Sequence, residues 1–107
     1  MPGSLRFYEL LESMADTHER KNQDYSPGAD PFKNFRASEE IGIPAWIGAW
    51  IRLQDKVSRC TSLIRQYAQN GEIQPAVVSE KLDDTLIDLA NYALLVRCLY
   101  EQSEENK

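Results

Sequence analysis

Two long stretches of helical periodicity, separated by only a few residues, constrain the fold of this chain most strongly. Residues 44–70 carry apolar side chains three or four positions apart, and Asn70-Gly71 then ends the pattern. The apolar stripe comprises Trp46, Trp50, Leu53, Val57, Cys60, Ile64 and Tyr67. Residues 77–102 have the same spacing and are apolar around most of their circumference. Because the connector at 71–76 is short, we expect two antiparallel neighbouring helices.

The first part of the chain predicts a third helix followed by a long loop. Residues 4–22 have helical periodicity, and Ser4 is a suitable N-cap. Residues 23–43 contain two prolines and two glycines, which favour turns, and we expect a loop there with a short helical turn around 37–41. A loop of this length in a small domain is often functional.

The predicted architecture is therefore a single all-α domain over residues 1–107. Three main helices and a short one form an antiparallel bundle, and the last five residues, 103–107, form a polar tail. Three helices leave apolar surface on the helix at 77–102 without a partner. We therefore expect the bundle to be completed by a homo-oligomer, either a dimer or a tetramer.

Charge and composition exclude several classes of partner. The chain has 17 acidic and 12 basic residues, and its net charge of −5 argues against binding to a nucleic-acid backbone. A small anionic ligand is still compatible with a local basic patch or a bound metal. No signal peptide and no apolar run of about 20 residues is present, so we expect a cytoplasmic protein with no membrane span. Cys60 and Cys98 lack zinc-site spacing and are expected to be buried thiols.

A line of carboxylates is the first candidate functional feature. Glu80, Asp84 and Asp88 are each four residues apart, so they share one side of the predicted helix, and Asn91 continues the line. Oxygen-only ligands favour Mg²⁺, with Mn²⁺ as the alternative ion. A solvated face is the other interpretation, since acidic residues are favourable near a helix N-terminus. Spacing alone leaves both interpretations open.

A basic face on the preceding helix is the second candidate feature. Arg52, Lys56 and Arg59 lie on one side of that helix, with Asp55 beside them. The three bases could hold phosphate oxygens, and Asp55 could add a carboxylate to a metal site. An interhelical network of salt bridges is an equally good explanation of the pattern.

The predicted loop and the last residues of the helix before it supply the third set of candidates. Aromatic and Asn side chains can stack on a nucleobase and hydrogen-bond to its edge, and a lysine can reach a phosphate. The candidate residues are Lys21, Asp24, Tyr25, Asn34 and Phe35. Composition favours the simpler alternative, in which these are turn residues and Phe35 packs onto the core.

Two runs in the second half and two upstream fragments share the pattern of a known family. They are Arg52-x-x-Asp55-Lys56-x-x-Arg59, Glu80-x-x-x-Asp84-Thr85-Leu86-x-Asp88-Leu89-Ala90-Asn91-Tyr92-Ala93, Lys21-x-x-Asp24-Tyr25 and Asn34-Phe35. Over roughly residues 15–97, the chain resembles the nucleotide-modification-associated domain of phages and bacteria. That domain is similar to the all-α nucleotide pyrophosphatase superfamily, which includes MazG-like and dimeric dUTPase-like enzymes.

The resemblance implies a Mg²⁺ site built from an ExxE pair and an ExxD pair on neighbouring helices. Asp84 matches the aspartate of the ExxD pair, Asp55 matches the second ExxE acid, and Asn91 matches a substrate-contacting asparagine. The chain departs from the pattern at Arg52, where the first ExxE acid would stand. It also departs at Lys81, where the ExxD glutamate would stand; Glu80 comes one residue earlier.

The function implied by the resemblance is that of a Mg²⁺-dependent hydrolase that cleaves a (d)NTP to the monophosphate and pyrophosphate. The setting it implies is a phage enzyme of the nucleotide pool. The expected metal ligands are Asp55, Glu80, Asp84 and Asp88, with Glu80 and Asp84 as the catalytic pair. The expected substrate contacts are Lys21, Asp24, Tyr25, Asn34, Phe35, Arg52, Lys56, Arg59 and Asn91. Two alternatives remain open: a phage protein that binds or sequesters a nucleotide without turnover, and a helical interaction protein whose polar stripes are salt bridges.

Overall fold

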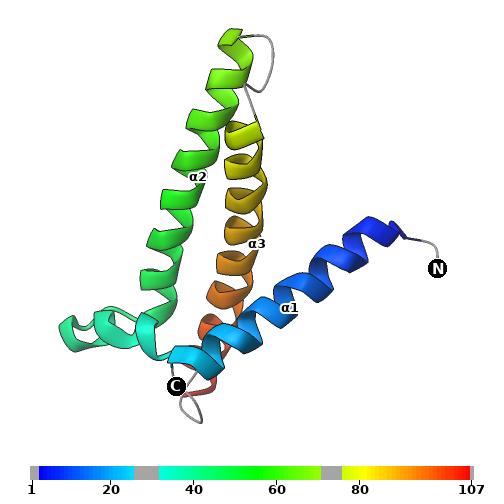
Figure 1. The fold of residues 1–107 in the computed structure, drawn as a ribbon. Coiled ribbons are helices and arrows are strands. Elements are labelled where there is room, and N and C mark those ends of the chain that lie inside the picture. Colours follow the sequence, from blue (N-terminus) through cyan, green and yellow to red (C-terminus); the bar gives the residue numbers. More distant parts are fainter. Residues whose placement is uncertain (1–2, 26–31, 71–75, 107) are drawn as a thin grey trace. The chain divides into compact units, whose positions relative to one another are not determined.

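The computed structural model describes residues 3–25, 32–70 and 76–106, and all regular secondary structure in these ranges is helical. The elements are α1 (Leu5–Tyr25), the 3-10 helix η1 (Lys33–Ile41), α2 (Ala45–Asn70) and α3 (Ala76–Glu105), as Figure 1 shows. The all-α prediction of three main helices and a short one is confirmed. The chain divides into two compact units, Met1–Asn34 (unit 1) and Phe35–Lys107 (unit 2).

In unit 1, α1 begins where the sequence predicts. The Ser4 side chain caps the helix, because its Oγ accepts a hydrogen bond of 3.2 Å from the Phe7 amide. The helix ends at Tyr25, three residues later than predicted. The stretch up to Tyr25 contains no Pro or Gly, whereas Ser26 precedes Pro27, a position at which helical backbone is disfavoured.

The segment predicted as a loop contains η1, which is helical over nine residues rather than one short turn. It ends in a Schellman motif at Gly42, whose φ of 81° favours glycine. The Gly42 amide donates to the Glu39 carbonyl and the Ile43 amide to the Ser38 carbonyl, both at 3.0 Å. This tight stop turns the chain directly into α2.

In unit 2, α2 and α3 pack side by side and run in opposite directions (Figure 1). Trp46 and Tyr100 meet edge to face at one end, with ring centroids 5.5 Å apart. Near the middle, Lys56 lies opposite Asp88. These contacts confirm the predicted antiparallel pair. They also give the register: Trp46 lies level with Tyr100, and Lys56 lies level with Asp88.

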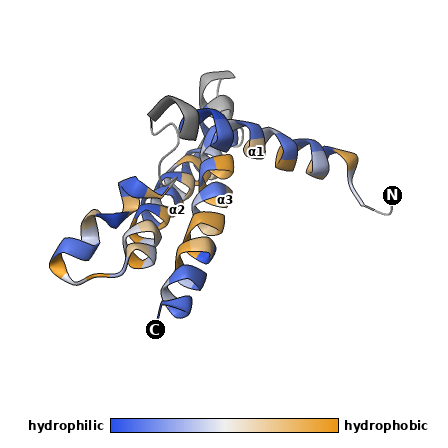
Figure 2. Cartoon of the chain, turned by 90° about the horizontal axis from the view of Figure 1, so that it is seen from below, coloured by the Kyte–Doolittle hydropathy of each residue, from blue (hydrophilic) through white to orange (hydrophobic). Residues whose placement is uncertain are grey.

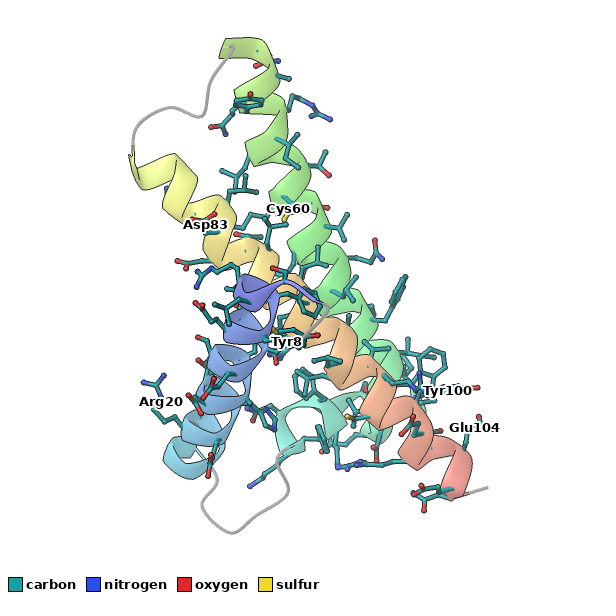
Figure 3. All side chains as sticks on the ribbon, turned by 90° about the vertical axis from the view of Figure 1, so that its right-hand side faces the viewer. Tyr8, Arg20, Cys60, Asp83, Tyr100 and Glu104 are labelled. Atoms are coloured by element: carbon teal, nitrogen blue, oxygen red, sulfur yellow. The ribbon has the colours of Figure 1, made fainter. Side chains whose placement is uncertain are left out.

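The core of unit 2 lies between these two helices. Its buried members on the helices are Ala45, Ala49, Leu53, Cys60 and Leu63 from α2, and Thr85, Leu95 and Leu99 from α3. Cys60 is labelled in Figure 3 on the side of α2 toward α3. The buried hydroxyl of Thr85 donates to the Lys81 carbonyl at 2.6 Å, so this polar group is satisfied within its own helix.

Two sequence expectations change because a pair of helices buries only one side of each. The single apolar stripe predicted for α2 divides: Leu53 and Cys60 are buried, whereas residues such as Trp50 and Val57 are exposed. Cys98 is exposed, so its expected burial is wrong. It directly precedes the buried Leu99, and one residue turns the helix by about 100°.

The C-terminal end of α3 is longer than predicted. The helix continues to Glu105 instead of ending at 102, because Glu and Gln are good helix formers and no Pro or Gly intervenes. Apolar residues, coloured orange in Figure 2, occur on both α2 and α3 among hydrophilic ones. Within residues 3–25, 32–70 and 76–106, no helix combines the length and apolar composition that crossing a membrane requires.

Candidate functional site

A group of two cations, two aromatic rings and one carboxylate lies on one side of the α2–α3 pair. We call it the cation–aromatic cluster; its members are Phe35, Arg52, Lys56, Asp88 and Tyr92. The Arg52 guanidinium lies over the Phe35 ring at 5.1 Å from its centroid, and the Lys56 ammonium lies 5.9 Å from the centroid of Tyr92. The two rings meet edge to face with centroids 6.1 Å apart. The Lys56 Nζ is 3.5 Å from Asp88 Oδ2.

Helical spacing explains why these residues meet. Arg52 and Lys56 are one turn apart on α2, and Asp88 and Tyr92 are one turn apart on α3. The antiparallel register then brings the middle of each helix together, so that Lys56 can contact Asp88 and Tyr92 alike.

A simple rule defines the side of the hairpin on which the cluster lies. Arg52 directly precedes buried Leu53, and Asp84 directly precedes buried Thr85. Seen from one end of the pair, successive residues turn clockwise along one helix and anticlockwise along its antiparallel neighbour. Positions directly before core residues therefore fall on the same side of an antiparallel pair. By the same rule, Arg59 before Cys60 lies on this side, which we call the cluster side.

Phe35 is supplied by η1, and several contacts hold this segment against the helices. The Arg36 guanidinium donates to Gln102 Oε1 on α3 at 3.0 Å and pairs with Glu39 at 3.2 Å. Gly48 on α2 allows a close approach, because a Cβ there would lie 3.2 Å from the Ser38 Oγ. Phe35 is therefore positioned by tertiary contacts rather than by a long mobile loop.

The cluster is locally positive in a chain whose net charge is −5. It holds two cations and one carboxylate, and Arg59 adds an exposed cation on the same side. The side chains of Lys56 and Asp88 are 29% and 45% exposed, so this ion pair is open to solvent and is worth at most about 1 kcal/mol. The cations are therefore oriented by the rings and by Asp88, yet accessible to an anion from solution.

The carboxylates fit a metal held jointly with phosphates better than a metal held by protein alone. Within residues 3–25, 32–70 and 76–106, no group of three His, Cys, Asp or Glu side chains is placed to hold a metal ion. Asp84 and Asp88 share the cluster side of α3, and Mg²⁺ is commonly bound by one or two carboxylates together with substrate phosphates. The side chain of Glu80 lies outside the described part.

The structure brings together four of the residues proposed from sequence: Phe35, Arg52, Lys56 and Asp88. Three more lie on the cluster side of their helices: Arg59, Asp84 and Asn91. Asp55 is exposed on α2 and belongs to none of the contacts in the cluster. Lys21, Asp24, Tyr25 and Asn34 belong to unit 1, and the side chains of Asp24 and Tyr25 lie outside the described residues.

Sequence reasoning missed Tyr92 as a site residue. It stands four residues after Asp88 on the same line of α3, directly after Asn91, and this spacing is the signal that identifies it. The contribution of Arg36 and Gln102, which are far apart in sequence, had no comparable signal.

Comparison with protein-family models, with curated proteins and with solved structures found no match to this chain.

Proposed function

We propose that the cluster side binds the phosphates of a nucleoside triphosphate and that the chain is a Mg²⁺-dependent pyrophosphohydrolase, releasing a monophosphate and pyrophosphate. One observation carries the proposal. Arg52 and Lys56 are held over the rings of Phe35 and Tyr92, one turn apart and next to Asp88.

Phosphate is the anion that suits this pair of cations. The planar guanidinium of Arg52 can donate two parallel hydrogen bonds to phosphate oxygens, and Lys56 acts as a compact point charge. Two cations one helical turn apart match a chain of phosphates better than a single carboxylate. Arg59 extends the same line toward the following turn of α2.

Asp84 and Asp88 support the metal-dependent part of the proposal. Together with phosphate oxygens they supply enough ligands for Mg²⁺, or Mn²⁺, entering with the nucleotide. The bound ion would neutralise the phosphates and activate an attacking water. Glu80 and Asp55 remain proposed further ligands, with Glu80 as acceptor of the proton from that water. Lys21, Asp24, Tyr25, Asn34 and Asn91 remain proposed contacts to the base or sugar.

The test of turnover is to incubate the chain with each (d)NTP and Mg²⁺ and to measure pyrophosphate and monophosphate. We expect release from at least one nucleotide, loss of release in Asp84→Ala, and little change in Asp83→Ala. Asp83, labelled in Figure 3, is the matched control because it is the neighbouring carboxylate on α3 and is turned by about 100°. Binding of nucleotides without release from any of them would refute the enzymatic proposal.

A second function is favoured by a specific contact, namely the ion pair of Lys56 with Asp88 at 3.5 Å. This pair neutralises a carboxylate that a metal would need, and Arg52 stands where the resemblance implies an acid. Both features suit a protein that binds or sequesters a nucleotide without cleaving it. Tight binding that is unchanged when EDTA removes divalent ions, with no turnover, would support this alternative.

Nucleoside triphosphates are cytoplasmic metabolites, so we propose a cytoplasmic role, in a bacterium or in a phage-infected cell.

A purely structural role for the polar residues predicts a different result from nucleotide binding. In that case no nucleotide should raise the melting temperature of the chain.

A further inference from the structure

The two aromatic rings of the cation–aromatic cluster are already engaged by neighbours in unit 2. The Arg52 guanidinium lies 5.1 Å from the centroid of Phe35, and the Lys56 ammonium lies 5.9 Å from that of Tyr92. The rings meet at an interplanar angle of 87°, so the edge of one lies against the face of the other. A nucleobase stacks on the face of an aromatic side chain. A base would therefore have to displace these partners before it could stack here.

The two cations, in contrast, are arranged to bind an anion. A ring attracts a positive charge but supplies no oxygen acceptor, so the N–H groups of Arg52 and Lys56 are available to phosphate oxygens. The ion pair of Lys56 with Asp88 is partly exposed, and such a pair is weak enough to be exchanged. Both cationic side chains are long, and a ring that restrains one of them lowers the conformational entropy lost when phosphate binds.

Phe35 is held firmly enough to act as such a support. The next residue, Arg36, donates to Gln102 on α3 at 3.0 Å. The Ser38 hydroxyl donates to the Phe35 carbonyl at 3.4 Å, and its oxygen lies 3.2 Å from the place of a Cβ on Gly48 of α2. The helix η1 is thus fixed against both α2 and α3, and the Phe35 ring is fixed with it.

We propose that the cluster recognises the phosphate chain of its ligand and not the nucleobase, so that inorganic tripolyphosphate is a ligand of the same site. Phe35 and Tyr92 are positioning residues, which orient Arg52 and Lys56 toward the phosphates. This inference rests on the proposed function, because both concern the same anion site. Selection among nucleobases is left to residues outside the cluster. Loss of either ring then weakens the binding of every ligand with a phosphate chain by the same factor.

The expected size of this effect follows from the strength of one cation–π contact. At an exposed site, such a contact corresponds to a change of about two- to fivefold in an equilibrium constant. Phe35→Leu and Tyr92→Leu each remove a ring and keep an apolar side chain. Each should lower the affinity for tripolyphosphate and for a nucleoside triphosphate by about this factor. Tyr92→Phe keeps the ring and should keep the affinity.

Calorimetric titration of the full chain without Mg²⁺ measures these affinities, with tripolyphosphate and each (d)NTP as probes. Tyr100→Leu is the matched control, and Tyr100 is labelled in Figure 3. It removes one ring of the edge-to-face pair of Trp46 and Tyr100, whose centroids are 5.5 Å apart and which lies outside the cluster. This control should bind both kinds of probe as the unmodified chain does.

A second measurement follows the position of Arg52 without any ligand. An aromatic ring shifts the NMR resonances of groups held over its face. The Nε–H resonance of Arg52 should therefore be displaced from that of the exposed Arg65, and Phe35→Leu should abolish the displacement. An Arg52 resonance that is unchanged in Phe35→Leu would overturn the positioning role.

The results distinguish this inference from the proposed function. Binding of a nucleotide but not of tripolyphosphate would overturn the inference and leave the proposed function standing. A loss in Phe35→Leu that is confined to nucleotides would overturn it too, since base stacking predicts that result, as would an equal loss in Tyr100→Leu. Binding of tripolyphosphate without turnover of any nucleotide would support the inference and refute the enzymatic proposal. Binding of neither probe would overturn both.

Circular dichroism checks that each variant is folded. If the leucine variants do not fold, competition in the unmodified chain decides the matter. Displacement of a bound nucleotide by tripolyphosphate would support the inference, and failure to displace it would overturn the inference.

Discussion

The ion pair of Lys56 and Asp88 gives a prediction whose size follows from its geometry. At 3.5 Å, two unit charges attract by about 1 kcal/mol when the surroundings behave as water. Both side chains are partly exposed, and ordering them opposes the attraction, so we expect a net coupling of about 0.5 kcal/mol. A double-mutant cycle with Lys56→Met and Asp88→Asn measures it from urea unfolding.

Because the ion pair of Lys56 and Asp88 is weak, a bound anion should replace Asp88 as the partner of Lys56. A phosphate oxygen that binds Lys56 must displace Asp88, so removing this carboxylate should raise the affinity for a metal-free nucleotide. A coupling of about 0.5 kcal/mol corresponds to about a twofold gain in affinity for Asp88→Asn. With Mg²⁺ present the sign should reverse, since the variant lacks a metal ligand. Calorimetric titration with and without Mg²⁺ measures both affinities.

Two results would refute this reasoning. A coupling above about 2 kcal/mol would mean that the pair is a structural element too strong for a phosphate to replace. Loss of metal-free affinity in Asp88→Asn would mean that Asp88 contacts the nucleotide rather than competing with it. Asp83→Asn is the control for a change of charge alone, because it removes one negative charge from the same helix.

Three further predictions concern the fold. Leu99→Ala should lower the free energy of unfolding by about 2–4 kcal/mol because Leu99 is buried between α2 and α3, whereas exposed Leu94→Ala should change it by less than about 0.5 kcal/mol; urea unfolding measures both. Gly42→Ala should destabilise by about 1 kcal/mol because of its positive φ, and Gly42→Asn by less; an equal loss would contradict the assigned conformation. Cys98 should react with a thiol reagent in the folded chain and Cys60 only on unfolding, as mass spectrometry of the labelled peptides would show.

The helices of this chain were predictable because their signals are local. Ser4 marks the start of α1 through its own side chain, and the short connector between α2 and α3 requires an antiparallel pair. The ends of α1 and α3 were harder to place, since polar helix formers such as Glu104 and Glu105 suit both a helix and a tail. The Schellman stop at Gly42 depends on a backbone conformation that composition alone does not specify.

The candidate site was predictable in part for the same reason. Helical spacing placed Arg52 and Lys56 on one side of α2, and it placed Asp84 and Asp88 on one side of α3. It did not determine which side of α2 meets which side of α3. Contacts between distant residues fix that choice, and Phe35 reaches the cluster through a link between Arg36 and Gln102, 66 residues apart. The division of the α2 stripe into a buried row and an exposed row likewise depends on how many helices pack around it.

The measurement that tests the central claim most directly is the shift in melting temperature caused by nucleotides in the unmodified chain and in three variants. A ligand that binds the folded state must raise this temperature. We expect a rise with at least one (d)NTP that is lost in Arg52→Met and Lys56→Met. The rise should be retained in Arg65→Met, where the arginine lies on another side of α2. No rise with any nucleotide, or an equal rise in all three variants, would contradict a nucleotide site at the cation–aromatic cluster.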